Sequence, residues 1–181
     1  MLAIVATDLT YGLAKTDTDS PTGLPWVSTL DLQLFAYLSK KSVNWVSKST
    51  FLTLPPHVQE SRHFCVLTRN PEYHYENKFE ELVEHRVRAS DNKQLLIGGL
   101  KAYEKLIPWS NCVIHTIFLQ DYKCDIKLPP SLLGKFNQVM RIYSQYQELP
   151  SGPPMTIDVY YNNSANIPVG YIKKLAKLTK A

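Results

Sequence analysis

Two adjacent glycines stand where a short apolar run gives way to a helical pattern, a setting that suits phosphate binding. Residues 94–97, which are Gln94 and three apolar residues, fit a buried strand, and apolar positions spaced three and four apart continue from Leu100 to Ile107. Gly98 and Gly99 allow a sharp turn and bring bare main-chain N–H groups to the start of the helix. The pattern predicts either a strand, turn and helix that bind a phosphate or a tight turn that binds no ligand.

A carboxylate beside apolar residues is suited to proton transfer. Asp31 falls in the first turn of a helix that is predicted to begin at Ser28 or Thr29. Burial against apolar partners would raise the pKa of Asp31 and fit it for acid chemistry. A plain structural role is also open, because an acid in the first turn complements the helix dipole. The apolar side chains close to it in the sequence are Trp26, Leu32 and Phe35.

A lysine set among hydroxyl side chains indicates a second anion site. Lys48 follows Ser47 and precedes Ser49 and Thr50, at the start of a predicted short helix. The alternative is a helix start that a hydroxyl caps and that holds no anion.

The composition excludes several classes of protein. The chain has 181 residues, 44% of them hydrophobic, which suits one domain with a full core. Its net charge of +4 resides in the lysines of residues 164–181, so we expect no nucleic-acid-binding surface. Three cysteines without metal-type spacing predict buried thiols, with no disulfide and no metal site. No apolar run is long enough to span a bilayer and no leader pattern is seen, so we expect a cytoplasmic monomer that binds no membrane.

Segments typical of strands and of helices alternate along the chain. Strands are expected at residues 2–6, 43–46, 63–68, 94–97, 112–119, 136–147 and 155–161. Helices are expected from residue 28 or 29, from residue 47, near residue 79 and over residues 100–107, with long loops over residues 7–28 and 121–130. The alternation predicts an α/β fold with a mainly parallel sheet that ends in antiparallel strands.

Three motifs occur in order along the first 163 residues. They are Pro-Trp-x4-Asp-x3-Phe from Pro25, Arg-x4-Leu-Thr from Arg62 and Ile-Gly-Gly-x3-Tyr from Ile97. Together they resemble the dihydrofolate reductase family. The resemblance implies a three-layer fold with an eight-stranded, mostly parallel mixed sheet, an antiparallel C-terminal strand and flanking helices. Residues 1–163 would form the catalytic domain and residues 164–181 a basic C-terminal extension.

The resemblance also implies a reaction, the NADPH-dependent reduction of 7,8-dihydrofolate to 5,6,7,8-tetrahydrofolate, which antifolates such as methotrexate and trimethoprim inhibit. The implied catalytic residues are Asp31, Thr116 and Trp26. The implied substrate contacts are Val5, Ala6, Leu32, Phe35, Leu54, Arg62, Ile97 and Tyr103. The implied NADPH contacts are Ala6, Gly12, Leu24, Lys48, Ser49, Thr50, Leu67, Thr68, Arg69, Gly98, Gly99, Leu100, Lys101, Ala102 and Tyr103. A cis peptide bond between the two glycines is implied as well.

Two other functions remain open from the sequence. The reductase of a pyrimidine intermediate in riboflavin synthesis shares this fold and cofactor site, but it leaves Arg62 and the Pro-Trp-x4-Asp motif unexplained. The other is a structural module that binds the cofactor without catalysis and acts through its basic tail. Such a module would not need intact catalytic and substrate residues, which here are Asp31, Phe35, Arg62 and Thr116.

The last residues of the chain, 164–181, carry an amphipathic pattern. One side is apolar and the other carries lysines. We expect a helix that docks on its own domain or frays, or one that docks on a partner or on anionic lipid. The expected apolar side contains Val169, Ile172, Leu175 and Ala176.

Overall fold

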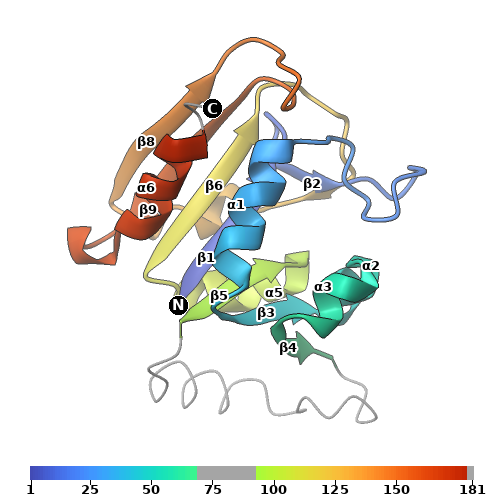
Figure 1. The fold of residues 1–181 in the computed structure, drawn as a ribbon, viewed down its shortest axis with the longest axis horizontal. Coiled ribbons are helices and arrows are strands. Elements are labelled where there is room, and N and C mark those ends of the chain that lie inside the picture. The colour runs from blue at the N-terminus through green and yellow to red at the C-terminus, as the bar shows by residue number, and fades with distance from the viewer. Residues whose placement is uncertain (69–92, 179–181) are drawn as a thin grey trace.

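The computed structural model describes residues 1–68 and 93–178, whose elements form layers around one sheet (Figure 1). The sheet contains seven strands in the order β4-β3-β5-β1-β6-β9-β8. Their bounds are β1 (Leu2–Thr7), β3 (Val43–Ser47), β4 (His63–Leu67), β5 (Gln94–Gly98), β6 (Cys112–Phe118), β8 (Gln138–Gln145) and β9 (Met155–Tyr161). A separate two-stranded ribbon joins β2 (Gly12–Ala14) to β7 (Ile126–Lys127).

The main sheet is parallel from β4 to β6 and antiparallel beyond β6. Strand β1 pairs in parallel with β5 and β6, whereas β9 pairs antiparallel with β6 and β8. This confirms the predicted α/β fold with a mostly parallel sheet. The described part of the chain contributes seven strands to the main sheet, against the eight expected for the whole chain, and the short β2 and β7 pair with each other outside it.

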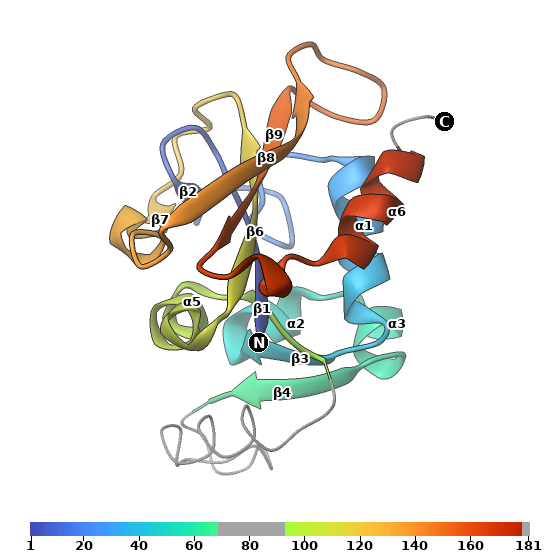
Figure 2. The same cartoon turned by 90° about the vertical axis from the view of Figure 1, so that its left-hand side faces the viewer.

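Helices cover both faces of the sheet (Figure 2). Helix α5 (Leu100–Leu106) lies on one face, and α1 (Thr29–Ser39) and α6 (Val169–Leu178) lie together on the other. The short helices are α2 (Lys48–Thr53), α3 (Pro56–Glu60), η1 (Ile107–Trp109), η2 (Pro130–Leu132) and η3 (Ser164–Asn166). Every helix in the described ranges is too short or too polar to cross a membrane.

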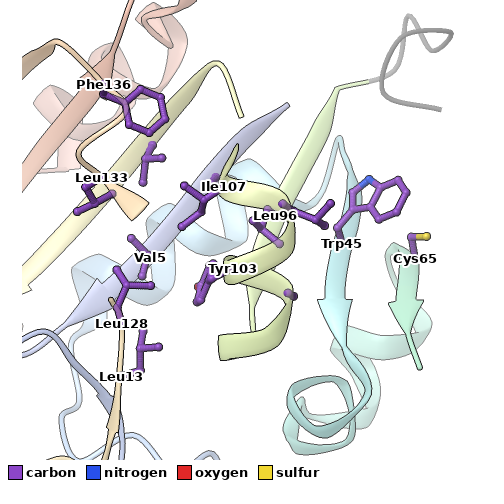
Figure 3. Close-up of a cluster of buried hydrophobic side chains, with 14 residues drawn as sticks. Val5, Leu13, Trp45, Cys65, Leu96, Tyr103, Ile107, Leu128, Leu133 and Phe136 are labelled. Carbon is purple, nitrogen blue, oxygen red and sulfur yellow. The ribbon is translucent and has the colours of Figure 1, made fainter. Parts of the chain in front are cut away.

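Apolar side chains fill the space on each side of the sheet. The first cluster, which includes Val5, Leu96 and Ile107, lies on the α5 side (Figure 3). The second cluster, which includes Leu34 and Ile157, involves α1 and α6. The free cysteines, all buried as predicted, are Cys65, Cys112 and Cys124.

Helix α1 begins at Thr29 because Ser28 caps it. The Ser28 backbone is extended, and its Oγ accepts a hydrogen bond from the backbone N–H of Asp31 at 3.2 Å. This confirms the predicted helix start. It also holds Asp31 in the first turn of the helix, whose buried Leu34 anchors the helix to the sheet.

Two regions differ from the sequence-based expectation. The predicted stop at Pro55-Pro56 is followed by a further helix, α3, in which Pro56 takes the first position. Proline suits that position because its missing N–H would have no partner there. The two predicted long loops contain β2 and β7, whose few paired residues give no alternating pattern to recognise. The helix expected near residue 79 lies outside the described residues.

Helix α6 packs on α1 with only part of the expected apolar side. Tyr171 and Leu175 are buried in the second cluster, whereas Val169 is 56% exposed. The expected apolar side was based on spacing alone. Leu175 and the half-buried Ile172 pack inward as expected, and the ring of Tyr171 also fills space against the main body of the protein.

Asp8 holds together the loop after β1. Its Oδ1 accepts hydrogen bonds from the backbone N–H of Gly12 at 2.7 Å, from that of Thr10 at 2.8 Å and from the Thr10 hydroxyl at 2.9 Å. Its Oδ2 accepts one from the backbone N–H of Tyr122 at 3.2 Å. Burial acts to raise the pKa of Asp8, but the hydrogen bonds outweigh burial and hold the pKa below its usual range.

Asp8→Asn is expected to destabilise the protein by roughly 1–3 kcal/mol, because a neutral amide cannot accept all of these bonds as strongly. A carboxyl with a depressed pKa stabilises the fold above its unfolded pKa and loses that contribution as the pH falls. Thermal melts should therefore show the full difference near about pH 7 and a shrinking one below about pH 4. A difference that does not change in acid would contradict this account.

Candidate active site

A cavity of about 1530 Å³ opens at the carboxyl ends of the parallel strands. Ends of β1, β3, β5 and β6 form its floor, and residues of α1, α2, α3, α5 and α6 form its walls. Ligands of open α/β sheets bind at this edge. The volume exceeds the roughly 1,000 Å³ at the upper end of single-ligand pockets, so the cavity has room for two ligands side by side.

Asp31 is the one carboxylate among the described residues that line the cavity. The Thr116 hydroxyl donates a hydrogen bond to Asp31 Oδ1 at 2.9 Å. Strands β1 and β6 pair in parallel, with Ala6 opposite Thr116. Thr116 therefore lies near the carboxyl end of β6, within hydrogen-bonding distance of Asp31 on α1. Burial raises the pKa of Asp31, and the Thr116 hydrogen bond opposes the rise only in part. The site therefore holds a carboxyl that takes up a proton more readily than an exposed aspartate.

Positive side chains outnumber acids in the cavity lining. Lys48, Arg62, Lys101 and Lys105 all line it, against the single acid Asp31. The cavity is therefore suited to anionic ligands. Among the described residues, no cluster of three or more His, Cys, Asp or Glu side chains could hold a metal ion.

The glycine turn has the predicted strand-turn-helix form. Strand β5 ends at Gly98, and α5 begins at Leu100. Gly99 has φ +87°, a region that favours glycine, and a Cβ there would collide with the Ser47 side chain. The expected cis bond between the glycines is corrected, because every peptide bond in the described residues is trans. The positive φ of Gly99 makes the turn without it.

Gly99→Ala is expected to destabilise the protein by about 1–3 kcal/mol, because alanine is strained at this φ and its methyl group meets Ser47. The matched control is Gly170→Ala in α6, where the new Cβ would lie an ordinary 3.5 Å from the Tyr37 hydroxyl. Chemical denaturation of both variants gives the comparison. Equal stability of the two variants would show that the Gly99 conformation is not required.

The start of α2 faces this turn across one end of the cavity. Ser47 Oγ accepts a hydrogen bond from the Thr50 backbone N–H at 3.4 Å and donates one to Thr50 Oγ1 at 3.1 Å. A Cβ on Gly98 would lie 3.0 Å from Thr50 Cγ2, so the two segments are in close contact. Ser47 therefore caps the helix as an ordinary start would. The same residues, with Lys48, also line the cavity beside the glycines.

Arg62 has donors with no partner in the described chain. Its Nε and Nη1 are buried and form no hydrogen bond, and its Cζ lies 5.0 Å from the centre of the Phe35 ring. Desolvation lowers the pKa of the guanidinium, which nevertheless stays charged at physiological pH. A planar cation with free donors at a cavity wall fits a ligand carboxylate.

Most of the residues predicted for the site line this one cavity. They are Val5, Ala6, Leu24, Asp31, Leu32, Phe35, Lys48, Ser49, Thr50, Leu54, Arg62, Leu67, Thr68, Ile97, Gly98, Gly99, Leu100, Lys101, Ala102, Tyr103 and Thr116. Gly12 does not line the cavity and lies against Asp8. Arg69 lies outside the described residues.

Trp26 is placed in the second core cluster and not among the cavity-lining residues. Its indole stacks on Phe118 with ring centroids 4.8 Å apart and meets Tyr122 edge-on at 5.5 Å. Its indole N–H is buried and has no hydrogen-bond partner among the described residues. A catalytic contact by this side chain would need a water or a movement that brings it to the cavity.

Sequence reasoning missed several lining residues. The helical spacing of α1 could have indicated Leu34 and Leu38, and β1 could have indicated Ile4. No motif marked His57 of α3 or Tyr171 of α6, because each reaches the cavity only through tertiary packing.

Comparisons with known proteins show which family this chain resembles in sequence and in fold. A family profile described as dihydrofolate reductase matches residues 3–160. A dihydrofolate reductase of Mycoplasma pneumoniae is 29% identical over 105 residues, which cover 52% of this chain and 65% of that protein, less than two thirds of its length. The solved structure of Enterococcus faecalis dihydrofolate reductase, complexed with NADP(H) and RAB-propyl, has a similar fold. Its TM-score is 0.64 at 20% identity, over 90% of this chain and 96% of that one.

Proposed function

Because this chain belongs to the dihydrofolate reductase family, we propose that it catalyses the NADPH-dependent reduction of 7,8-dihydrofolate to 5,6,7,8-tetrahydrofolate. The observation that carries the proposal is Asp31, the single carboxylate of a cavity otherwise rich in cations, held by Thr116. Dihydrofolate and antifolate inhibitors would be its ligands, and it would act as a cytoplasmic monomer. Residues 1–163 would form the catalytic domain and residues 164–181 an extension of it.

Gly98 and Gly99 would hold the diphosphate of NADPH. Neither residue carries a side chain, so the main-chain N–H groups at the start of α5 are open to a phosphate. Lys48, Thr50 and Lys101 line the cavity there and would bind the remaining phosphate groups. When bound, NADPH supplies the hydride.

Asp31 would orient the pterin ring of dihydrofolate. Its carboxylate can accept hydrogen bonds from the 2-amino and N3 donors of the ring, and Thr116 keeps the carboxylate in one orientation. The ionised carboxylate would make the pterin N5 more basic, and the proton would reach N5 through a water. Burial raises the pKa of Asp31, so a larger share of this carboxyl is protonated near neutral pH than in an exposed aspartate, and that protonated form would supply the proton to the water.

Arg62 would bind the α-carboxylate of the glutamate tail. The unpartnered Nε and Nη1 would gain two charge-assisted hydrogen bonds that the described chain does not supply. Leu32, Phe35 and Leu54 would pack against the p-aminobenzoyl group and exclude water from the reacting atoms.

Product analysis tests the proposal. The purified chain is incubated with NADPH and dihydrofolate and, separately, with NADPH and the pyrimidine substrate of the riboflavin-pathway reductase. We expect tetrahydrofolate in the first mixture and no change in the second. Reduction of the pyrimidine alone would favour the riboflavin-pathway activity. Binding of NADPH with no product in either mixture would favour a structural role.

A further inference from the structure

The C-terminal helix reaches the cavity wall beside the proposed catalytic carboxylate. The family match ends at residue 160, and α6 lies beyond it. Nevertheless Tyr171 of α6 lines the same cavity as Asp31 and is only 3% exposed. A residue outside the family match thus forms part of the site.

Contacts with α1 hold Tyr171 in this place. The Tyr37 hydroxyl of α1 donates a hydrogen bond to the Gly170 carbonyl at 3.4 Å, and the Lys174 ammonium lies 6.0 Å from the centre of the Tyr37 ring. One turn after Tyr171, Leu175 is buried in the second cluster. Helix α6 therefore docks along the helix that carries Asp31 (Figure 2).

The groups that face Asp31 show how Tyr171 can act on it. The cavity is also lined by Lys48, His57, Arg62, Lys101 and Lys105, but among the described residues the charge of Asp31 acts on the hydroxyls of Tyr103 from α5 and Tyr171 from α6. Burial and then the charge of Asp31 raise the pKa of both hydroxyls. Both tyrosines are therefore neutral wherever Asp31 titrates, and neither acts on it as a charge. Their remaining effect on the carboxyl is to exclude water.

The two tyrosines differ in what anchors them. The Tyr103 hydroxyl donates to the carbonyls of Ile4 and Ile97, at 2.9 and 3.1 Å, and so joins two strands of the sheet. No hydrogen bond joins the Tyr171 hydroxyl to another described residue. The Tyr171 ring thus contributes to the wall through its bulk and apolar contacts.

We propose that Tyr171 is a positioning residue of the active site, whose ring closes the cavity wall next to Asp31 and keeps bulk water from the carboxylate. The C-terminal helix would then be a structural part of the substrate site. The expected effect on dihydrofolate turnover rests on the proposed function, whereas the expected effect on the pKa of Asp31 does not. Opening the wall would hydrate Asp31, stabilise its charged form and lower its pKa.

The test compares three variants of the full chain. Tyr171→Ala opens the wall, Tyr171→Phe keeps the ring, and Ile172→Ala truncates a half-buried neighbour on the same helix that does not line the cavity. The pKa of Asp31 is measured by carbon-13 NMR of aspartate-labelled protein, with the signal assigned by its loss in Asp31→Asn. We expect Tyr171→Ala to lower this pKa by about one unit, and the other two variants to leave it unchanged.

The pH profile of dihydrofolate turnover gives a second readout. In Tyr171→Ala alone, the part of the profile that follows the ionisation of Asp31 should move to lower pH by as much as the pKa of Asp31 does. Equal Asp31 titration in Tyr171→Ala and Ile172→Ala would overturn the inference. If alanine prevents folding, Tyr171→Leu should show a smaller shift in the same direction, and no shift would again overturn it. An absence of dihydrofolate turnover in the unmodified chain would count against the proposed function only, because the NMR titration needs no turnover.

Discussion

Replacing Asp31 by asparagine is expected to lower dihydrofolate turnover near neutral pH by at least about a hundredfold, the usual contribution of a positioned acid or base. The amide keeps the shape of the side chain and can still accept the Thr116 hydrogen bond, but it carries no charge and releases no proton. Turnover should recover in part as the pH is lowered, because the substrate then gains its proton from solvent. Steady-state rates across a range of pH measure both effects.

The same variant should be more stable than the unmodified chain. Burial raises the folded-state pKa of Asp31, so the native state favours the neutral carboxyl. The stability that this group contributes is full below its unfolded pKa of about 4 and is lost as the pH rises through the folded pKa. Asp31→Asn should therefore melt at a higher temperature near about pH 7, with the gain shrinking in acid. Near-normal turnover, or a lower melting temperature at neutral pH, would contradict the assigned role.

Replacing Arg62 by leucine is expected to raise KM for dihydrofolate by about a hundredfold or more, since a bidentate pair with a carboxylate would be lost. Turnover at saturating substrate should change little, because Arg62 lies away from the reacting atoms. The variant should melt no lower than the unmodified chain, because it removes a cation whose buried Nε and Nη1 have no hydrogen-bond partner in the described ranges. Activity measured over a range of dihydrofolate concentrations separates KM from turnover.

Two controls sharpen the Arg62 experiment. Arg62→Lys keeps the charge but lacks the planar pair of donors, so it should recover only part of the affinity. A dihydropterin without the glutamate tail should be reduced equally by the unmodified chain and by Arg62→Leu. If Arg62→Leu raises KM equally for dihydrofolate and for the dihydropterin without the tail, then Arg62 does not bind the glutamate carboxylate.

The local parts of the fold could be predicted because they depend on neighbours in the sequence. Ser28 caps α1 through a residue three positions along, and the apolar run before Gly98 forms β5 as its composition indicates. The motifs that carried the family resemblance also lie within such short segments. Asp31 and Thr116 are 85 residues apart, and no local pattern could have paired them. The resemblance alone supplied that contact.

The parts that could not be predicted depend on how distant segments pack. The ribbon of β2 and β7 joins two stretches that read as loops, because neither has enough paired residues to show alternation. Tyr171 was missed for a similar reason. Spacing on α6 predicted one apolar side, but the docking surface of α1 determined which residues of α6 became buried.

The most direct test of the proposed reaction follows NADPH absorbance after dihydrofolate is added to the intact chain, with and without methotrexate. We predict that NADPH is consumed in equimolar amount with dihydrofolate, and that methotrexate stops the reaction. No dihydrofolate-dependent consumption of NADPH, by protein that is folded and binds NADPH, would contradict the assignment of this cavity to dihydrofolate reduction.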